Sequence, residues 1–214
     1  TLFRSLAIFK REFKSYFQNV IGWLFVAALL AVYGLYFYVY NLKNGYPYIS
    51  YDLNGIGFIM MIAVPILTMR SLSDEKKTKT DQLMLTSPVS VGKIVAGKYF
   101  AMAAVYTIDI ALFALSPLVL SIYGKVALSE AYVALFGYWL YGLSCIAVGL
   151  FISSISESVI ISAILTFAAL FLSYMMQSIT GLISSSGNLL TKVLNCFDLY
   201  TPFENFVSGC FSVT

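Results

Sequence analysis

Long apolar runs separated by short polar stretches dominate the chain. The runs cover residues 20–40, 55–72, 99–123, 131–152 and 158–179. A helix of about 20 residues crosses a hydrocarbon core of about 30 Å, and each run is close to that length. The runs are apolar on every face, whereas the strands of a membrane barrel alternate between apolar and polar positions. The pattern therefore predicts an all-α, polytopic transmembrane helical bundle, with five spans in a single domain over residues 1–214.

The segment before the first run, residues 1–19, has a helical periodicity of its own. Its apolar residues recur at steps of three and four and would share one face of a helix: Leu2, Leu6, Phe9, Phe13 and Phe17. Arg4 and Arg11 fall on the opposite face. Charges spread through the segment exclude a signal peptide. We predict an interfacial amphipathic helix, which either only anchors the first span or also touches a cytoplasmic partner.

Residues 73–97 form a charged island between the second and third apolar runs. Ser73 is placed to cap a helix whose first turn carries Asp74 and Glu75, because acidic residues favour the positive end of a helix dipole. Pro88 ends that helix. We predict a short helix across the mouth of the bundle, able to fit a groove on a partner; a solvated basic loop is the alternative.

Composition and charge placement agree with a membrane protein. Of the residues, 60% are hydrophobic and 11% are charged, against about 25% charged in soluble domains. The connections between successive spans alternate between the two sides of the membrane. Of the 13 basic residues, only Lys43, Lys125 and Lys192 then lie on the side opposite the N-terminus. The positive-inside rule then places the N-terminus and residues 73–97 in the cytoplasm and the segment 180–214 outside.

Few residues of the chain are of the types that catalyse reactions or bind metals and cofactors. The chain has no His, the commonest general base and metal ligand. Residues 92–99 fit G-x-x-x-x-G-K, but Tyr99 stands where a phosphate-binding loop needs Ser or Thr for magnesium. We therefore predict that this chain binds no cofactor and that Lys98 snorkels to the membrane surface. Cys196 and Cys210 could pair only in an oxidising compartment.

Asp109 is a carboxylate deep within an apolar run. A charge there is costly, so its side chain is expected to face the bundle interior, water or a hydrogen-bond donor. Two interpretations are open: a place on a transport path, or a packing role, either through a hydrogen bond to a Tyr, Ser or Thr on a neighbouring span or as a protonated acid. An intramembrane enzyme acting on lipid, with Asp109 as base, is a further alternative, although no plausible nucleophile accompanies it.

The charged island also carries a longer pattern of residues. They are Glu75, Lys76, Thr80, Leu83, Met84, Pro88, Val89, Ser90, Ile94, Val95, Gly97 and Lys98. This spacing resembles the hallmark of type-2 ABC exporter permeases, E-K/R-x-x-G-T-x-E-x-L-L-x-x-P-V-S followed by I-V-x-G-K. Residues 9–12, 69–70 and 153–157 extend the similarity over most of the chain, and the nearest branch is the small permeases related to gliding-motility transporters. Lys79 and Gln82 depart from it, because the family usually has Gly and often Glu there.

The resemblance implies the membrane permease subunit of an ATP-driven exporter, without catalysis by this chain. Two copies, or two related chains, would pair beneath separate cytoplasmic ATPase subunits that bind ATP and Mg, in a bacterial inner membrane. The residues implied at the ATPase interface are Glu75, Thr80, Leu83, Met84 and Pro88 of a coupling helix, with Lys10, Arg11 and Glu12 of the surface helix. Asp109 would be on the transport path.

The family has six spans, and the chain ends where a sixth should begin. We therefore expect these 214 residues to be a truncated chain. A membrane scaffold or immunity protein, which would bind partners without dependence on ATP, remains a further alternative. The transported substrate cannot be predicted from the sequence, because such paths are lined by ordinary apolar and hydroxyl side chains.

Overall fold

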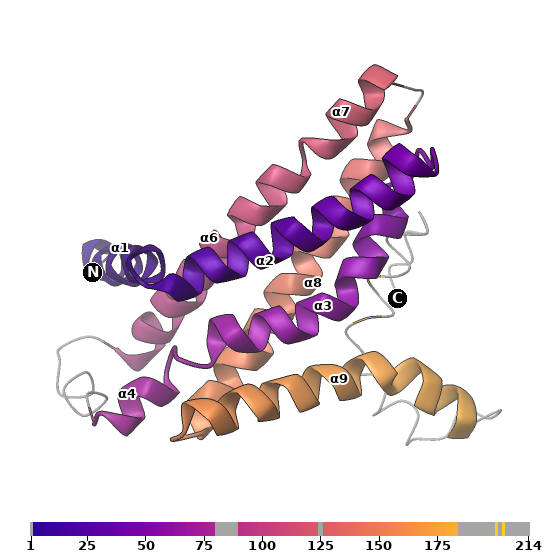
Figure 1. The fold of residues 1–214 in the computed structure, drawn as a ribbon. Coiled ribbons are helices and arrows are strands. Elements are labelled where there is room, and N and C mark those ends of the chain that lie inside the picture. The colour runs from indigo at the N-terminus through magenta and orange to yellow at the C-terminus, as the bar shows by residue number, and fades with distance from the viewer. Residues whose placement is uncertain (1, 80–89, 124–125, 184–199, 201–202, 204–214) are drawn as a thin grey trace.

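The computed structural model describes the backbone of residues 2–79, 90–123, 126–183, 200 and 203 (Figure 1). It describes the side chains of the same residues except 2–7 and 177–183. Its helices are α1 (Leu2–Gln18), α2 (Val20–Phe37), the π-helix η1 (Tyr38–Lys43), α3 (Ser50–Thr68), α4 (Ser73–Lys77), α6 (Val91–Phe113), α7 (Ser116–Tyr123), α8 (Leu128–Ile155) and α9 (Val159–Ile183). Within these ranges, 5 helical stretches are long and apolar enough to cross a membrane. The predicted all-α polytopic bundle is confirmed. The segment predicted to be external, 180–214, falls largely outside the described residues.

Two helices form the centre of the bundle. α3 packs against α2, α8 and α9, and α8 packs against α3, α6 and α9 (Figure 1). The most apolar windows of these two spans are 56% and 50% buried, against 28% for the first and last spans. The outer helices therefore present most of their apolar side chains to lipid or to another chain.

Two helices extend beyond the apolar runs. α3 begins at Ser50, before the run that starts at residue 55, and α6 begins at Val91, before the run that starts at residue 99. Each extension includes a polar side chain that is buried and paired within the protein. The Asn41 amide donates a hydrogen bond to the Asp52 carboxylate, and Lys98 is bound by two glutamates. Apolar runs locate the membrane-crossing core but not the helical turns that internal polar partners stabilise.

One end of the bundle gathers the charged elements. α1, α4 and the start of α6 lie together there, and α1 lies across the ends of α2 and α6 (Figure 1). We call it the basic end, because its described residues include Lys10, Arg11, Lys14, Arg70, Lys76, Lys77, Lys79, Lys93 and Lys98. η1 and α7 lie at the opposite end, which we call the far end.

The core between α2, α6 and α8 is built from aromatic rings. Tyr33 stacks on Phe113 with ring centroids 4.1 Å apart. The rings of Tyr106 and Tyr138 are 6.2 Å apart, and the Tyr106 hydroxyl donates a hydrogen bond of 2.7 Å to the Tyr138 carbonyl oxygen. Gly142 of α8 faces Tyr106, and a Cβ there would lie 2.3 Å from the ring. The absence of a side chain at Gly142 therefore lets α6 and α8 approach closely.

Candidate functional site

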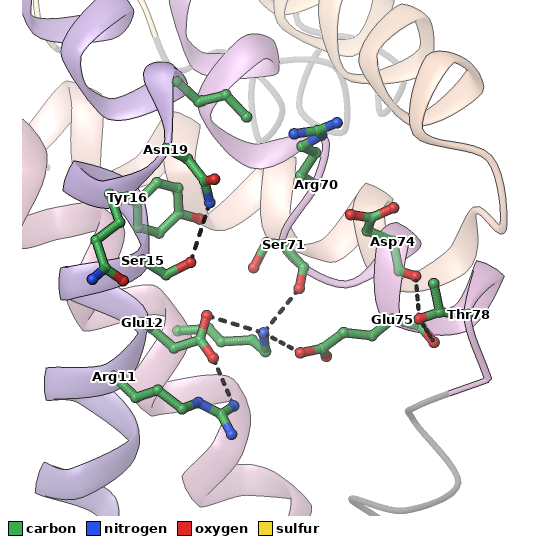
Figure 2. Close-up of a pocket in the computed structure, with 13 residues that line it drawn as sticks. Arg11, Glu12, Ser15, Tyr16, Asn19, Arg70, Ser71, Asp74, Glu75 and Thr78 are labelled. Atoms are coloured by element: carbon green, nitrogen blue, oxygen red, sulfur yellow. Dashed lines mark hydrogen bonds and ion pairs between the residues drawn. The ribbon is translucent and has the colours of Figure 1, made fainter.

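A polar pocket opens at the basic end between α1 and the segment that joins α3 to α4 (Figure 2). Its volume is about 450 Å³, and charged side chains of both signs line it. Arg70 and Asp74 lie on one side, and neither side chain forms an ion pair within the described residues. Burial raises the pKa of the Tyr16 hydroxyl well above its ordinary value, and the nearby Glu12 charge raises it further. Tyr16 therefore contributes a neutral hydroxyl to the pocket wall.

The predicted amphipathic segment is a helix, and it packs on α6 as well as on α2. Phe9, Phe13 and Phe17 form one stripe, with successive ring centroids 5.9 and 5.0 Å apart. Gly97 of α6 faces Ile8, whose nearest carbon would lie 3.0 Å from a Cβ at that position. Gly97 thus allows α1 to lie close to α6, which places the polar face of α1 beside the first turns of α6.

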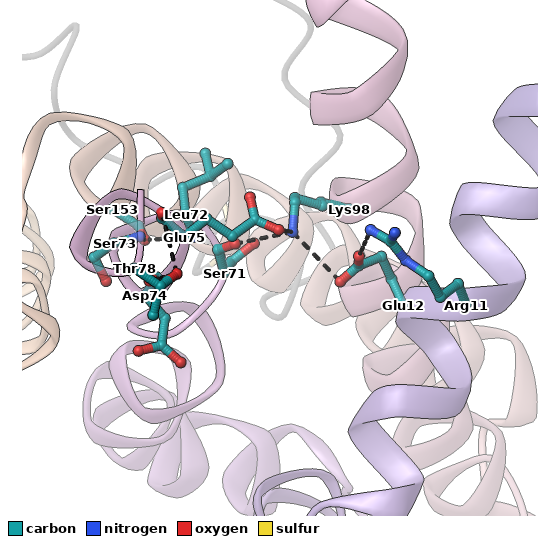
Figure 3. A network of polar contacts seen from close by, with 10 residues as sticks. All are labelled: Arg11, Glu12, Ser71, Leu72, Ser73, Asp74, Glu75, Thr78, Lys98 and Ser153. Carbon is teal, nitrogen blue, oxygen red and sulfur yellow. Dashed lines mark hydrogen bonds and ion pairs between the residues drawn. The ribbon is translucent and has the colours of Figure 1, made fainter. Parts of the chain in front are cut away.

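Lys98 occupies the junction of α1, α4 and α6 (Figure 3). Its side chain is only 3% exposed. The Nζ atom lies 2.7 Å from Glu75 Oε1 and 3.4 Å from Glu12 Oε2, and it donates a hydrogen bond of 3.0 Å to the Ser71 carbonyl oxygen. The prediction that Lys98 snorkels to the membrane surface is wrong, because two carboxylates from neighbouring elements reach the ammonium inside the protein.

The charges around Lys98 balance. Arg11 lies 2.8 Å from Glu12, so two cations face two carboxylates. The side chains of Glu12 and Glu75 are 16% and 18% exposed. A lysine buried without a counter-charge would be strongly unfavourable, whereas here the Coulomb attraction and the carbonyl hydrogen bond offset the loss of hydration. The four residues therefore form a neutral network that fixes three elements relative to one another.

A serine of α8 positions the start of α4. The backbone N–H groups of Leu72 and Ser73 each donate a hydrogen bond of 3.2 Å to Ser153 Oγ. The Ser73 hydroxyl donates to the Met69 carbonyl oxygen, and Leu72 takes the N-cap position. The prediction that Ser73 caps this helix is therefore wrong, because its hydroxyl already has a partner in the preceding turn. α4 also ends at Lys77, well before Pro88.

Lys79 adopts a left-handed backbone conformation with φ 55°. This is the position where the permease pattern usually has Gly. Glycine adopts positive φ without steric cost, whereas a Cβ crowds the carbonyl oxygen. The departure from the family pattern thus places a mildly strained residue two positions after the end of α4.

Replacing Lys79 with glycine is expected to raise the apparent melting temperature of the purified protein by about 1–2 °C. The relieved strain of about 1–2 kcal/mol is partly offset by the greater freedom of glycine in the unfolded chain. The control is Lys77→Gly, inside α4, which should lower the melting temperature because glycine disfavours a helix. Equal effects of the two changes would contradict the prediction.

The structure divides the predicted interface residues into three groups. Lys10 and Arg11 are exposed on α1. Glu12 and Glu75 line the pocket and bind Lys98. The others lie outside the described residues, namely Thr80, Leu83, Met84 and Pro88. A role for any of them in binding an ATPase stays a prediction.

Three residues of the basic end were missed as site residues by the sequence analysis. Lys98 was noted as part of a motif and as a snorkelling residue, and Ser71 and Ser153 were not considered as contacts. A lysine at the start of an apolar run, with acidic residues in two adjoining segments, is a signal that could have found Lys98. Nothing in the sequence indicates Ser153, because hydroxyl groups are common throughout these helices.

Asp109 lies on the buried face of α6 and is 0% exposed. Neither of its carboxyl oxygens accepts a hydrogen bond from any described residue. The packing hydrogen bond considered as one interpretation is therefore not observed in the described part of the chain. A role for Asp109 on a transport path stays a prediction.

The fold and the basic end define a multi-pass helical membrane protein whose charged groups gather at one mouth of the bundle. The profile of the family described as ABC-2 family transporter protein matches residues 14–211. The chain belongs to this family and is a membrane permease component of an ABC transporter. No curated protein and no solved structure matches it in the corresponding comparisons. The narrower resemblance to gliding-motility permeases stays a prediction.

Proposed function

We propose that this chain is the membrane subunit of an exporter driven by separate ABC ATPase subunits, which bind and hydrolyse ATP with Mg. The ATPase docks at the basic end, on the polar face of α1, on α4 and on residues 80–89. The chain lies in a bacterial inner membrane with its basic end facing the cytoplasm, in agreement with the positive-inside rule. Two copies of this chain, or this chain and a related one, pair in the membrane and enclose the substrate path between them.

The position and charge of the pocket support this docking face. Its walls come from α1 and α4, the two elements that the resemblance assigns to the ATPase interface. Residues 80–89 follow directly after Lys79, one residue beyond Thr78 of the pocket lining. Arg70 and Asp74 supply one charge of each sign for a partner. Complementary charges at such a rim set specificity and association rate.

The buried Lys98 is the observation that carries the proposal. Because it binds Glu12 of α1 and Glu75 of α4, a movement of either element is transmitted to α6. The hydrogen bonds to Ser153 connect α4 to α8 in the same way. An ATPase that displaces α4 would thus tilt two membrane-spanning helices together, as opening a path requires.

Co-expression with ABC ATPases from the same genome tests the proposal. Leu83→Asp and Arg70→Glu are each expected to reduce ATPase co-purification about tenfold or more, because they place an unmatched carboxylate at the docking face. The matched control for the arginine change is Lys43→Glu, which alters an exposed basic residue at the far end. It should leave the complex intact.

Purified complexes in nanodiscs give a second measurement, the stimulation of ATP hydrolysis by the permease. Stimulation should be lost with Leu83→Asp and retained with Lys43→Glu. If the ATPase does not associate, or if Lys43→Glu disrupts binding while Arg70→Glu does not, the docking face is wrongly assigned.

A further inference from the structure

An apolar groove of about 530 Å³ lies on the membrane-spanning surface between α6 and α8. Tyr99, Phe100 and Trp139 supply aromatic surface, and small residues of α6 such as Ala104 leave the space open. The Trp139 indole N–H donates a hydrogen bond of 3.1 Å to Thr107 Oγ1, which crosses from α8 to α6 at this groove. Pockets of this volume with aromatic walls hold small organic molecules.

An acidic group without a hydrogen-bond partner lies on the inner side of the same helix pair. Asp109 follows Thr107 and Ile108 of the groove by one turn or less, and Tyr138 directly precedes Trp139. The Asp109 carboxyl oxygens and the Tyr138 hydroxyl are buried, and none has a hydrogen-bond partner among the described residues. Tyr106 lies one helical turn before Asp109 on α6, and its ring centroid is 6.2 Å from that of Tyr138 on α8. A buried polar group left without partners is unfavourable, so this cluster favours a ligand that supplies what is missing.

From the proposed function as the membrane half of an exporter, we infer that α6 and α8 hold a binding site for a lipophilic organic cation. The cation enters from the bilayer through the groove and pairs with Asp109 when the Thr107–Trp139 contact opens. The carboxylate supplies the opposite charge, and the faces of Tyr106 and Tyr138 attract a cation through their ring quadrupoles. The apolar groove selects a cation with a large hydrophobic surface.

Charge complementarity favours this occupant over the others that an apolar groove accepts. A lipid chain or a helix of a second copy would fill the groove and leave Asp109 unpaired. A metal ion would need several oxygen ligands, and no cluster of three or more metal-binding residues is present in the described part of the chain. Asp109 is not part of the groove lining, so a bulky monovalent cation satisfies both the groove and the carboxylate only once the Thr107–Trp139 contact opens.

Binding of tetraphenylphosphonium to the purified chain in nanodiscs tests the inference. Tetraphenylborate has nearly the same size and shape with the opposite charge, and it reports simple partition into lipid. Equilibrium dialysis is expected to show saturable binding of the cation and only linear uptake of the anion. Saturable uptake of both ions, or of neither, would overturn the inference.

Three variants identify the site. Asp109→Asn should weaken tetraphenylphosphonium binding at least tenfold, and Ala104→Trp should weaken it by filling the groove without altering charge. Asp52→Asn is the matched control, because Asp52 is also a buried carboxylate but already accepts a hydrogen bond from Asn41. It should bind as the unaltered chain does. Unchanged affinity in Asp109→Asn, or equal losses in Asp109→Asn and Asp52→Asn, would contradict the site.

Chemical labelling covers the case in which a variant does not fold. Dicyclohexylcarbodiimide modifies carboxyl groups in apolar surroundings, and tetraphenylphosphonium should protect Asp109 of the unaltered chain, as read by mass spectrometry. Labelling that the cation leaves unchanged would reject the site. These measurements use no ATPase, so their failure leaves the docking proposal standing, and failure of the docking proposal leaves their result unaffected.

Discussion

Replacing Lys98 with methionine is expected to lower the free energy of unfolding by about 3 kcal/mol, because removing one partner of a buried ion pair leaves an uncompensated charge. In this protein the loss would leave two partly buried carboxylates, Glu12 and Glu75, facing one another. Their repulsion would separate α1 from α4. Thermal unfolding of the detergent-purified protein, followed by circular dichroism and by loss of monodisperse protein, measures the effect.

A second substitution separates the charge effect from a loss of packing. Adding Glu75→Gln to Lys98→Met should recover a clear part of the lost stability, since one unpaired carboxylate is removed. Lys93→Met is the control on the same helix, because Lys93 is exposed and takes part in no ion pair of the described residues. If the double variant is no more stable than Lys98→Met alone, the ion pairs are not what holds the basic end together.

The second large effect is expected at Gly22, near the start of α2. A Cβ at this position would lie 2.4 Å from the Tyr16 carbonyl oxygen and 2.9 Å from the Tyr16 carbonyl carbon. Both are backbone atoms of α1, so no rotation of a side chain can relieve the clash, and the helix itself has to move. Gly22→Ala should therefore destabilise the protein by about 3 kcal/mol, the upper part of the range for overpacking, and displace Glu12 from Lys98.

Gly34→Ala, on the same helix, is the matched control. A Cβ at Gly34 meets nothing within 4 Å. Alanine favours a helix over glycine by about 1 kcal/mol, so this variant should be at least as stable as the unaltered chain. Melting temperatures that fall equally in both variants would show that α1 does not rest on Gly22 as described.

The membrane-spanning helices could be predicted because the signal is local. An apolar run long enough to cross a bilayer reveals its helix whatever packs against it. The first turns of α3 and α6 lie outside the apolar runs. They depend on Asp52 and Lys98, polar side chains that are stable there only because Asn41 and the two glutamates reach them from other elements.

The candidate site could be predicted in composition but not in geometry. The sequence indicated a charged segment after the second span and a polar face on the first helix, and the structure brings Glu75 and Glu12 from these segments together. The sequence could not indicate that Lys98 lies between these two glutamates. The ion pair with Glu12 arises from the packing of α1 on α6 at Gly97. Asp109 was recognised as exceptional from its position alone, whereas its lack of a partner is a property of the packed bundle.

The ion pair between Lys98 and Glu75 also has a consequence for the chain that joins them. It holds the two ends of segment 75–98 together non-covalently, one end on α4 and the other on α6. Closing a loop costs conformational entropy that grows slowly with its length. In this protein the attraction between the Lys98 ammonium and the Glu75 carboxylate offsets that entropy cost before any partner binds. In the proposed complex, an ATPase that binds residues 80–89 would find both ends of this segment already fixed, so more of its binding free energy would remain for moving the membrane helices.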